Sequence, residues 1–246
     1  MENITGRKPC TAIVLSAGQG KRMGSTVQKQ YIELQGRPIV YYAMETFQQS
    51  DLIDQIVMVV GKGQEEYCRK EIVEKYGLTK VTQIVEGGAE RYHSVHNGLK
   101  KVEHEGYVFI HDGARPFVTE EILERVYRAV CDYPACVVGM PVKDTIKIVD
   151  EDGFTKETPN RNYVWQVQTP QVFSAPLIRD AYHKIISSGE VGITDDAMVV
   201  EKICNMKSRL VEGSYENIKI TTPGDLEIAE VFLKRRGKEC DRKCMK

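Results

Sequence analysis

Glycines and cations gather directly after the first apolar run of this 246-residue chain. The stretch VLSAGQGKRMGSTVQKQY, residues 14–31, holds three glycines together with Lys21, Arg22 and Lys29. A glycine-rich turn after a strand lets backbone N–H groups approach a phosphate closely. Such a turn serves hydride transfer in a dinucleotide fold, triphosphate hydrolysis in a P-loop, or a reaction that needs the cations themselves. The residues therefore predict phosphate binding and leave three chemistries to be separated.

The spacing of the glycines argues against the first two chemistries. A P-loop needs a hydroxyl residue after its Gly-Lys pair, but Arg22 follows Gly20-Lys21, and no glycine lies five residues before Gly20. The dinucleotide pattern GxGxxG also fails, because Gly18, Gly20 and Gly24 form GxGxxxG and no obvious ribose-binding acid follows about 20 residues later. Several cations beside one loop suit a reaction that builds negative charge on phosphorus.

Apolar patterns alternate between two periods over the first 140 residues. Short runs rich in β-branched residues predict strands at 11–16, 56–60, 81–85, 107–111 and 135–140. Residues spaced for amphipathic helices lie between them, at 39–48, 64–76, 90–102 and 119–132. This alternation predicts an α/β fold with a mostly parallel sheet and helices on both faces. Ligands bind at the carboxyl ends of such strands, so we expect the chemistry in the loops after Ser16, Val85 and Ile110.

The alternation breaks after Pro141. Residues 142–170 alternate with period two around a turn at Asp152-Gly153, which predicts an inserted β-hairpin. An isolated hairpin is marginally stable in water, so we expect it to pack on another surface, such as a second subunit. The remaining elements expected are a helix from about 175, a helix start at 194, strands at 208–213 and 217–221, a helix from Pro223 capped by Thr222, and a solvated tail at 234–246.

The composition excludes several classes of protein. Lys and Arg total 34 against 35 Asp and Glu, so the chain lacks the basic footprint of a nucleic-acid-binding protein. The seven cysteines are odd in number and not in paired CxxC spacing, which favours reduced thiols in a cytoplasm; Cys240 and Cys244 are expected in a frayed end rather than at a metal. No signal-peptide core and no apolar stretch of roughly 20 residues is present, so we expect a soluble cytoplasmic protein without membrane contact.

Seven motifs follow one another from about residue 11 to residue 233. They are AIVLSAGQGKRMGSTVQKQY, EGGAERYHSV, FIHDGARPFV, PVKDTIK, RNYVWQVQTPQVF, ITDDAMVVE and NIKITTPGDL. Together they resemble the 2-C-methyl-D-erythritol 4-phosphate cytidylyltransferase family. The resemblance implies one Rossmann-like nucleotidyltransferase domain, 1–246, whose hairpin arm at about 142–167 reaches across a two-fold homodimer. It also implies CMP transfer from CTP to methylerythritol phosphate, with release of pyrophosphate and with Mg²⁺ as the usual metal.

The chemistry of that reaction agrees with the cations in the first loop. The nucleophile is a phosphate monoester with a second pKa of about 6, so it is already mostly dianionic at neutral pH and needs no general base. The obstacle is to bring two polyanions together and to stabilise the charge of the in-line transition state. By the resemblance, Arg22 and Lys29 match the family positions that stabilise this transition state.

The other motifs supply binding residues by the same resemblance. Asp112 is the expected metal ligand. The expected nucleotide contacts are Ser16, Ala17, Gly18, Gly88, Ala89, Ser94 and Gly113. The residues expected to position the sugar phosphate are Arg161, Lys219, Thr145, Thr169 and Thr194, with Thr145 or Arg161 contributed by the neighbouring chain. Two positions depart from the family pattern, because Gln28 replaces a usual proline and Ala89 replaces a commonly polar residue.

Structural interpretations stand beside these functional ones. Without the resemblance, Asp112 could equally cap a helix, Lys219 could face solvent along a strand, and Asp195 and Asp196 could cap a helix without touching ligand.

Three other functions stay open at this stage. The first is a ribitol 5-phosphate cytidylyltransferase, which shares the glycine loop, the lysine and NIKITTP. The second is a non-catalytic nucleotide-binding regulator, which predicts loss of Arg22, Lys29 or Asp112, although all three are present. The third is a dehydrogenase, which predicts NAD binding.

Overall fold

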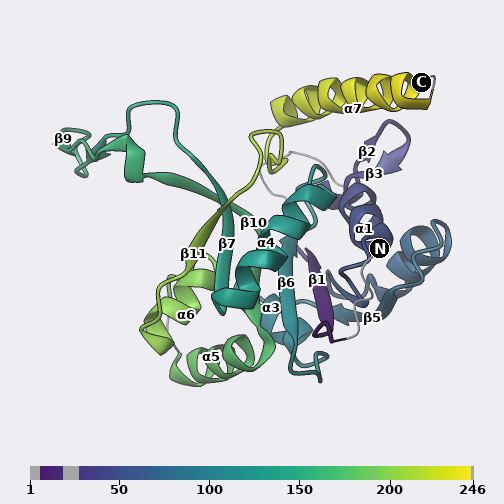
Figure 1. Ribbon diagram of the computed structural model, residues 1–246, viewed down its shortest axis with the longest axis horizontal. Coiled ribbons are helices and arrows are strands. Elements are labelled where there is room, and N and C mark those ends of the chain that lie inside the picture. The colour runs from purple at the N-terminus through teal and green to yellow at the C-terminus, as the bar shows by residue number, and fades with distance from the viewer. Residues whose placement is uncertain (1–5, 19–27, 190, 245–246) are drawn as a thin grey trace.

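A seven-stranded sheet forms the centre of the protein. The computed structural model describes residues 6–18, 28–189 and 191–244 (Figure 1). The strands are β1 (Cys10–Ser16), β4 (Gln55–Val60), β5 (Val81–Glu86), β6 (Tyr107–Asp112), β7 (Ala135–Pro141), β10 (Trp165–Ser174) and β11 (Arg209–Glu212). Their order is β11-β7-β10-β6-β1-β4-β5, and only β10 runs antiparallel to its neighbours. The predicted α/β fold with a mostly parallel sheet is confirmed.

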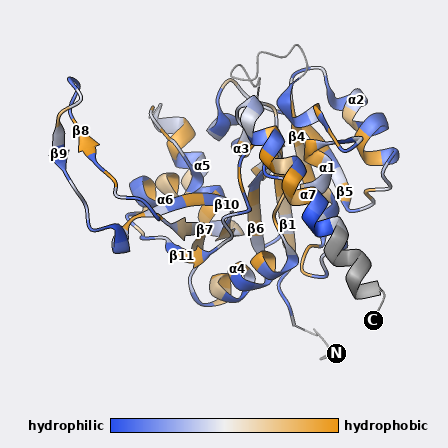
Figure 2. Ribbon diagram, turned by 90° about the horizontal axis from the view of Figure 1, so that it is seen from above, coloured by the Kyte–Doolittle hydropathy of each residue, from blue (hydrophilic) through white to orange (hydrophobic). Residues whose placement is uncertain are grey.

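Helices cover both faces of this sheet. One face carries α1 (Ile39–Gln49), α4 (Glu120–Asp132), and α2 (Glu65–Cys68) with its π-helical continuation Arg69–Glu74. The other face carries α3 (Arg91–Leu99), α5 (Ala175–Ser188) and α6 (Asp196–Cys204). Alternate strand residues enter the two cores, so that Val14 packs in one and Ile13 in the other. Figure 2 shows hydrophobic residues concentrated in the central strands β1, β4 and β6.

An arm projects from one end of the sheet (Figure 1). It leaves after Val142 and returns at Val164, where the Val142 N–H donates to the Val164 carbonyl at 3.0 Å. Within it, β8 (Ile148–Val149) and β9 (Thr155–Glu157) pair around a turn in which Gly153 has a φ of +87°. The expected hairpin extended to residue 170, whereas residues 165–174 belong to β10. This strand lies in the sheet between β6 and β7, where its residues 168–173 are buried.

The C-terminal third differs from the expectation in two places. Residues 217–221 form no strand; Ile220 makes one backbone hydrogen bond to Ala114 and packs in a small core under α7 (Pro223–Cys244). The expected tail from 234 is instead part of α7, which continues to Cys244. The side chains of Cys240 and Cys244 lie outside the described residues.

The last helix begins at Pro223, directly after Thr222, as expected, but the Thr222 hydroxyl acts as a donor to a carboxylate and not as an accepting cap. Asp225 accepts the backbone N–H groups and the hydroxyls of Thr221 and Thr222, at 2.8 to 3.0 Å. The Thr222 hydroxyl therefore donates to a side chain of the first helical turn, and the anion offsets the helix dipole.

Two two-residue strands, β2 (Glu33–Leu34) and β3 (Arg37–Pro38), form a small separate hairpin before α1. Within the described part of the chain, no helix has both the length and the apolar composition needed to cross a membrane.

Helix α3 lies close against the sheet at Gly98. A Cβ added there would lie 2.7 Å from Cγ2 of Ile13 and 3.2 Å from Cγ2 of Val59. Alanine favours a helix over glycine by about 1 kcal/mol, but overpacking a core costs about 1–3 kcal/mol. We therefore expect Gly98→Ala to lower the free energy of unfolding by about 1 kcal/mol in urea denaturation. Gly237→Ala in α7, where a Cβ meets nothing within 4 Å, is the matched control and should not destabilise. Equal stability of the two variants would contradict the close approach.

Candidate active site

A cavity of about 430 Å³ opens where β1 and β6 end and where β5 leads into α3. Eight residues singled out from the sequence line it: Ala17, Gly18, Lys29, Gly88, Ala89, Ser94, Asp112 and Lys219. Five others line it as well: Leu15, Gln30, Glu90, Arg91 and Ala114. Parallel strands bring their carboxyl ends to one edge of the sheet, and for this reason loops far apart in the sequence meet here.

The loop after β5 is shaped by close approach to its neighbours. A Cβ on Gly88 would lie 2.3 Å from Cβ of His93, and a Cβ on Gly87 would lie 2.4 Å from Cβ of Ala17. The Gly88 N–H donates to the hydroxyl of Ser94 at 3.0 Å. Only glycine fits these two positions, so the loop lies directly against the turn after β1 and both present backbone to the cavity.

Ser16 and Gly113, which were expected to contact the nucleotide, do not line the cavity. The Ser16 hydroxyl is buried without a hydrogen-bond partner among the described residues. A Cβ on Gly113 would lie 2.6 Å from that oxygen, and the Gly113 N–H donates to the Leu15 carbonyl at 2.9 Å. Their contribution is to hold the ends of β1 and β6 together.

Lys29 is the second residue of the described chain after the gap at 19–27. It begins the 3-10 turn Lys29–Tyr31 and lines the cavity. Gln28 before it has φ −60° and ψ 134°, which proline also adopts, so the departure from the family's proline leaves this conformation in place. Arg22 lies outside the described residues.

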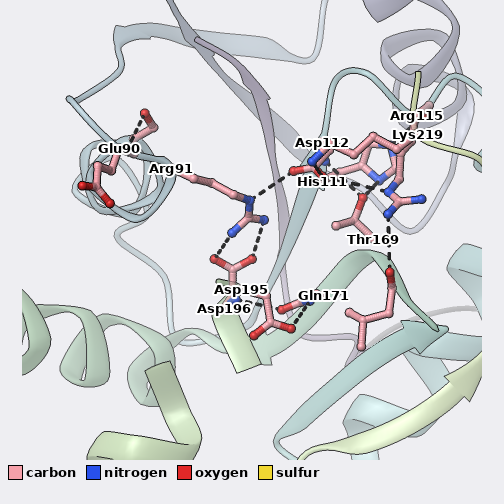
Figure 3. A network of polar contacts seen from close by, with 12 residues as sticks. Glu90, Arg91, His111, Asp112, Arg115, Thr169, Gln171, Asp195, Asp196 and Lys219 are labelled. Carbon is pink, nitrogen blue, oxygen red and sulfur yellow. Dashed lines mark hydrogen bonds and ion pairs between the residues drawn. The ribbon is translucent and has the colours of Figure 1, made fainter. Parts of the chain in front are cut away.

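Asp112 is contacted by cationic side chains at the cavity (Figure 3). Its Oδ2 accepts a hydrogen bond from Nζ of Lys219 at 2.7 Å, and its Oδ1 accepts one from Nε of Arg91 at 3.2 Å. Nε of Arg115 is 4.0 Å from Oδ2. Burial alone would raise the pKa of the Asp112 carboxyl, but these three cations outweigh burial and hold that pKa well below its usual range. Asp112 is a carboxylate at neutral pH.

Thr169 supports Asp112 from behind. Its hydroxyl accepts the Asp112 N–H at 3.1 Å and lies 3.0 Å from Nδ1 of His111. Burial lowers the pKa of His111 to about 4, so the imidazole is neutral at pH 7. The structure thus places Thr169 under the strand end and not in the cavity lining.

Three residues expected at the sugar phosphate lie away from the cavity of their own chain. Thr145 and Arg161 are on the arm, where Nη1 of Arg161 donates to the Lys143 carbonyl at 3.2 Å. Thr194 is exposed before α6, with its hydroxyl 3.6 Å from the sulfur of Met198. Within one chain, Lys219 lies at Asp112 and lines the cavity, whereas these three side chains do not line it.

The structure places an ion pair beside the cavity that the sequence did not predict there. Arg91 donates from Nη1 and Nη2 to the two carboxylate oxygens of Asp196, each at 2.8 Å. The cap of α6 is Asp195, whose Oδ1 accepts the Met198 N–H at 2.9 Å, whereas Asp196 is fully buried. The suggestion that Asp196 caps this helix is therefore wrong. The available signal was the arginine that directly follows the glycine turn in EGGAER.

Comparisons with known proteins agree over nearly the whole chain. The family model IspD, 2-C-methyl-D-erythritol 4-phosphate cytidylyltransferase, matches residues 10–235. The enzyme of that name from Lachnospira eligens is 49% identical over 225 residues, 91% of this chain and 99% of the relative. The one from Caldanaerobacter subterraneus subsp. tengcongensis is 45% identical over 226 residues, 92% of this chain and 99% of the relative.

Solved structures lead to the same family. The crystal structure of 4-diphosphocytidyl-2C-methyl-D-erythritolsynthase from Anaerococcus prevotii superposes with a TM-score of 0.81 at 36% identity, covering 92% of this chain and 96% of that one. The cytidylyltransferase structure from Thermus thermophilus gives a TM-score of 0.73 at 28% identity, covering 90% and 98%. With the cavity and its charged residues described above, these matches show that the chain belongs to the 2-C-methyl-D-erythritol 4-phosphate cytidylyltransferase family.

Proposed function

We propose that this protein transfers CMP from CTP to 2-C-methyl-D-erythritol 4-phosphate, giving 4-diphosphocytidyl-2-C-methyl-D-erythritol and pyrophosphate in isoprenoid precursor biosynthesis. The observation that carries the proposal is the cavity that Lys29, Lys219 and Asp112 line together with Gly18 and Gly88. Glycine loops let a triphosphate lie close to backbone N–H groups, and the two lysines supply fixed positive charge.

The reaction needs charge stabilisation more than proton transfer. An oxygen of the acceptor phosphate forms a bond to the α-phosphorus of CTP, and the bond from that phosphorus to the bridging oxygen breaks to release pyrophosphate. The acceptor is already ionised, so no side chain has to remove a proton. In this proposal Lys29 and Arg22 stabilise the transition state, Lys219 and Arg161 orient the acceptor, and Thr145, Thr169 and Thr194 support that orientation.

The donor set fits a magnesium ion that the nucleotide brings with it. Mg²⁺ keeps several waters and takes one or two carboxylates plus phosphate oxygens. Asp112 offers an ionised carboxylate at the cavity, and no cluster of three or more metal-binding side chains occurs among residues 6–18, 28–189 and 191–244. Asp112 would hold the ion together with the triphosphate. When bound, the ion would neutralise charge on the phosphates.

The arm supports a homodimer with composite sites. Phe154 is 73% exposed and Tyr163 is 85% exposed, which is unusual for large apolar side chains on a two-strand hairpin of marginal stability. The arm projects from the sheet (Figure 1), and its residues Thr145 and Arg161 do not line the cavity of their own chain. A second copy of the chain would cover the aromatic side chains and receive these two residues. The free thiols of the described cysteines suit a cytoplasmic location, which we also propose.

The acceptor is tested by a paired assay of pyrophosphate release. Purified enzyme with CTP and Mg²⁺ is given methylerythritol phosphate or ribitol 5-phosphate at equal concentrations. We expect kcat/KM to be higher with methylerythritol phosphate by several powers of ten, because a site built for one polyol leaves polar groups unpaired with another. A preference for ribitol 5-phosphate would overturn the proposed acceptor.

Lys29 is tested by truncation. If its ammonium group contacts the transition state, Lys29→Ala lowers kcat by roughly 10²-fold or more, by analogy with removal of an oxyanion-hole donor. Lys184→Ala removes an exposed lysine on α5 that pairs with Asp180 and should leave kcat unchanged. An unchanged kcat for Lys29→Ala would refute the assignment.

The composite site is tested by mixing two inactive variants. Lys29→Ala damages the cavity and Arg161→Ala damages the arm, so each homodimer should have little activity. If arms are exchanged, the heterodimer contains one site with both residues intact, and a random equimolar mixture should recover about a quarter of wild-type activity. No recovery, although mixed dimers are detected by native mass spectrometry, would mean that Arg161 does not act across the dimer.

A further inference from the structure

Three cations surround Asp112, and two of them, Lys219 and Arg91, differ in the number of hydrogen bonds that fix their side chains. The side chain of Lys219 is 35% exposed and makes a single hydrogen bond to Asp112, at Oδ2. Arg91 is also partly exposed, at 27%, yet its guanidinium donates to Asp112 and twice to Asp196. An incoming phosphate can therefore compete with the Asp112 carboxylate for the ammonium group of Lys219. To capture Arg91 it would have to break a bidentate pair with a buried carboxylate.

The anchor of Arg91 is itself fixed from two sides. The hydroxyl of Tyr182 on α5 donates to Oδ1 of Asp196 at 2.5 Å, and both side chains are fully buried. The backbone N–H groups of Asp196 and Ala197 donate to Oε1 of Gln171 on β10, at 3.0 and 2.9 Å. The position of the Asp196 side chain is thus fixed by α5 and β10, which do not line the cavity.

These contacts close a ring around Asp112 (Figure 3). β10 holds the Asp112 backbone through Thr169 and holds the start of α6 through Gln171. α6 then holds Arg91 through Asp196, and Arg91 returns to Oδ1 of Asp112. Arg91 is also the first residue of α3, directly after the loop that lines the cavity with Gly88 and Ala89.

We propose that Arg91, anchored by Asp196, is a positioning residue that fixes the Asp112 carboxylate at Oδ1, while Lys219 exchanges between Oδ2 of Asp112 and a phosphate of the bound substrates. The proposal deepens the proposed function and rests on it. Arg91 acts through Asp112 and does not itself bind the transferred phosphate. A lysine in its place keeps the charge but cannot serve Asp112 and Asp196 together, because it lacks the planar fork of donors.

The test is a double-mutant cycle on Arg91→Lys and Asp112→Asn. Loss of a residue that orients a ligand group typically costs 10–100-fold, so we expect Arg91→Lys to lower kcat by roughly that factor. Because Arg91 acts through Asp112, the double variant should lose no more than Asp112→Asn alone. Arg179→Lys on α5 is the matched control: its side chain is 28% exposed, it pairs with Glu105, and it should behave as wild type.

Two results would overturn the proposal. One is a double variant whose loss is the product of the two single losses. The other is an Arg91→Lys enzyme with the kcat of Arg179→Lys. If Arg91→Lys fails to fold, Tyr182→Phe, which removes only the hydroxyl on Asp196, replaces it in the same cycle with the same expectation.

A calorimetric readout separates this proposal from the proposed function. The dissociation constant for CTP with Mg²⁺ is measured without any acceptor, so it is defined even if the acceptor is another polyol phosphate. Any change that Arg91→Lys causes in this constant should vanish in the Asp112→Asn background. A change that persists there would show that Arg91 acts independently of Asp112, whatever the enzyme's acceptor is.

Discussion

The candidate site depends on one carboxylate kept ionised in a buried place. Removing a carboxylate from water is costly, and Asp112 is 8% exposed, so it needs compensating positive charge close by. Arg91, Lys219 and Arg115 supply that charge from α3, from the segment before α7 and from the loop after β6. Because three separate parts of the chain meet at one side chain, the same interaction that neutralises Asp112 also sets the shape of the cavity.

The parallel sheet makes this meeting possible. β1 lies between β6 and β4, with Leu15 opposite Asp112 and Ser16 opposite Val60, so these strands end at one level. The loops that follow are packed so closely that side chains larger than hydrogen are excluded at Gly87, Gly88 and Gly113. The backbone around the cavity is therefore fixed by the sheet, whereas charge is added by side chains at the edge of the sheet.

The arm has a different physical character from the rest of the chain. Among the described residues its two short strands pair only with each other, and large side chains such as Phe154 and Tyr163 are exposed to solvent. Central strands, in contrast, are buried on both faces. An arm that projects from the sheet could reach the cavity of a second copy, as we propose for Arg161.

The sequence by itself determined the fold class and most of the lining of the cavity. Apolar periodicity located the parallel strands, and the glycine loops with Lys29, Asp112 and Lys219 were recognisable because each belongs to a local motif. Tertiary structure alone decided what no local pattern contains: that residues 217–221 run as an irregular segment beneath α7, that β10 inserts antiparallel, and that Asp196 pairs with Arg91. These features arise from contacts between segments far apart in the sequence, such as Arg91 and Asp196, which are 105 positions apart. A pattern along the chain does not contain the energies of such contacts.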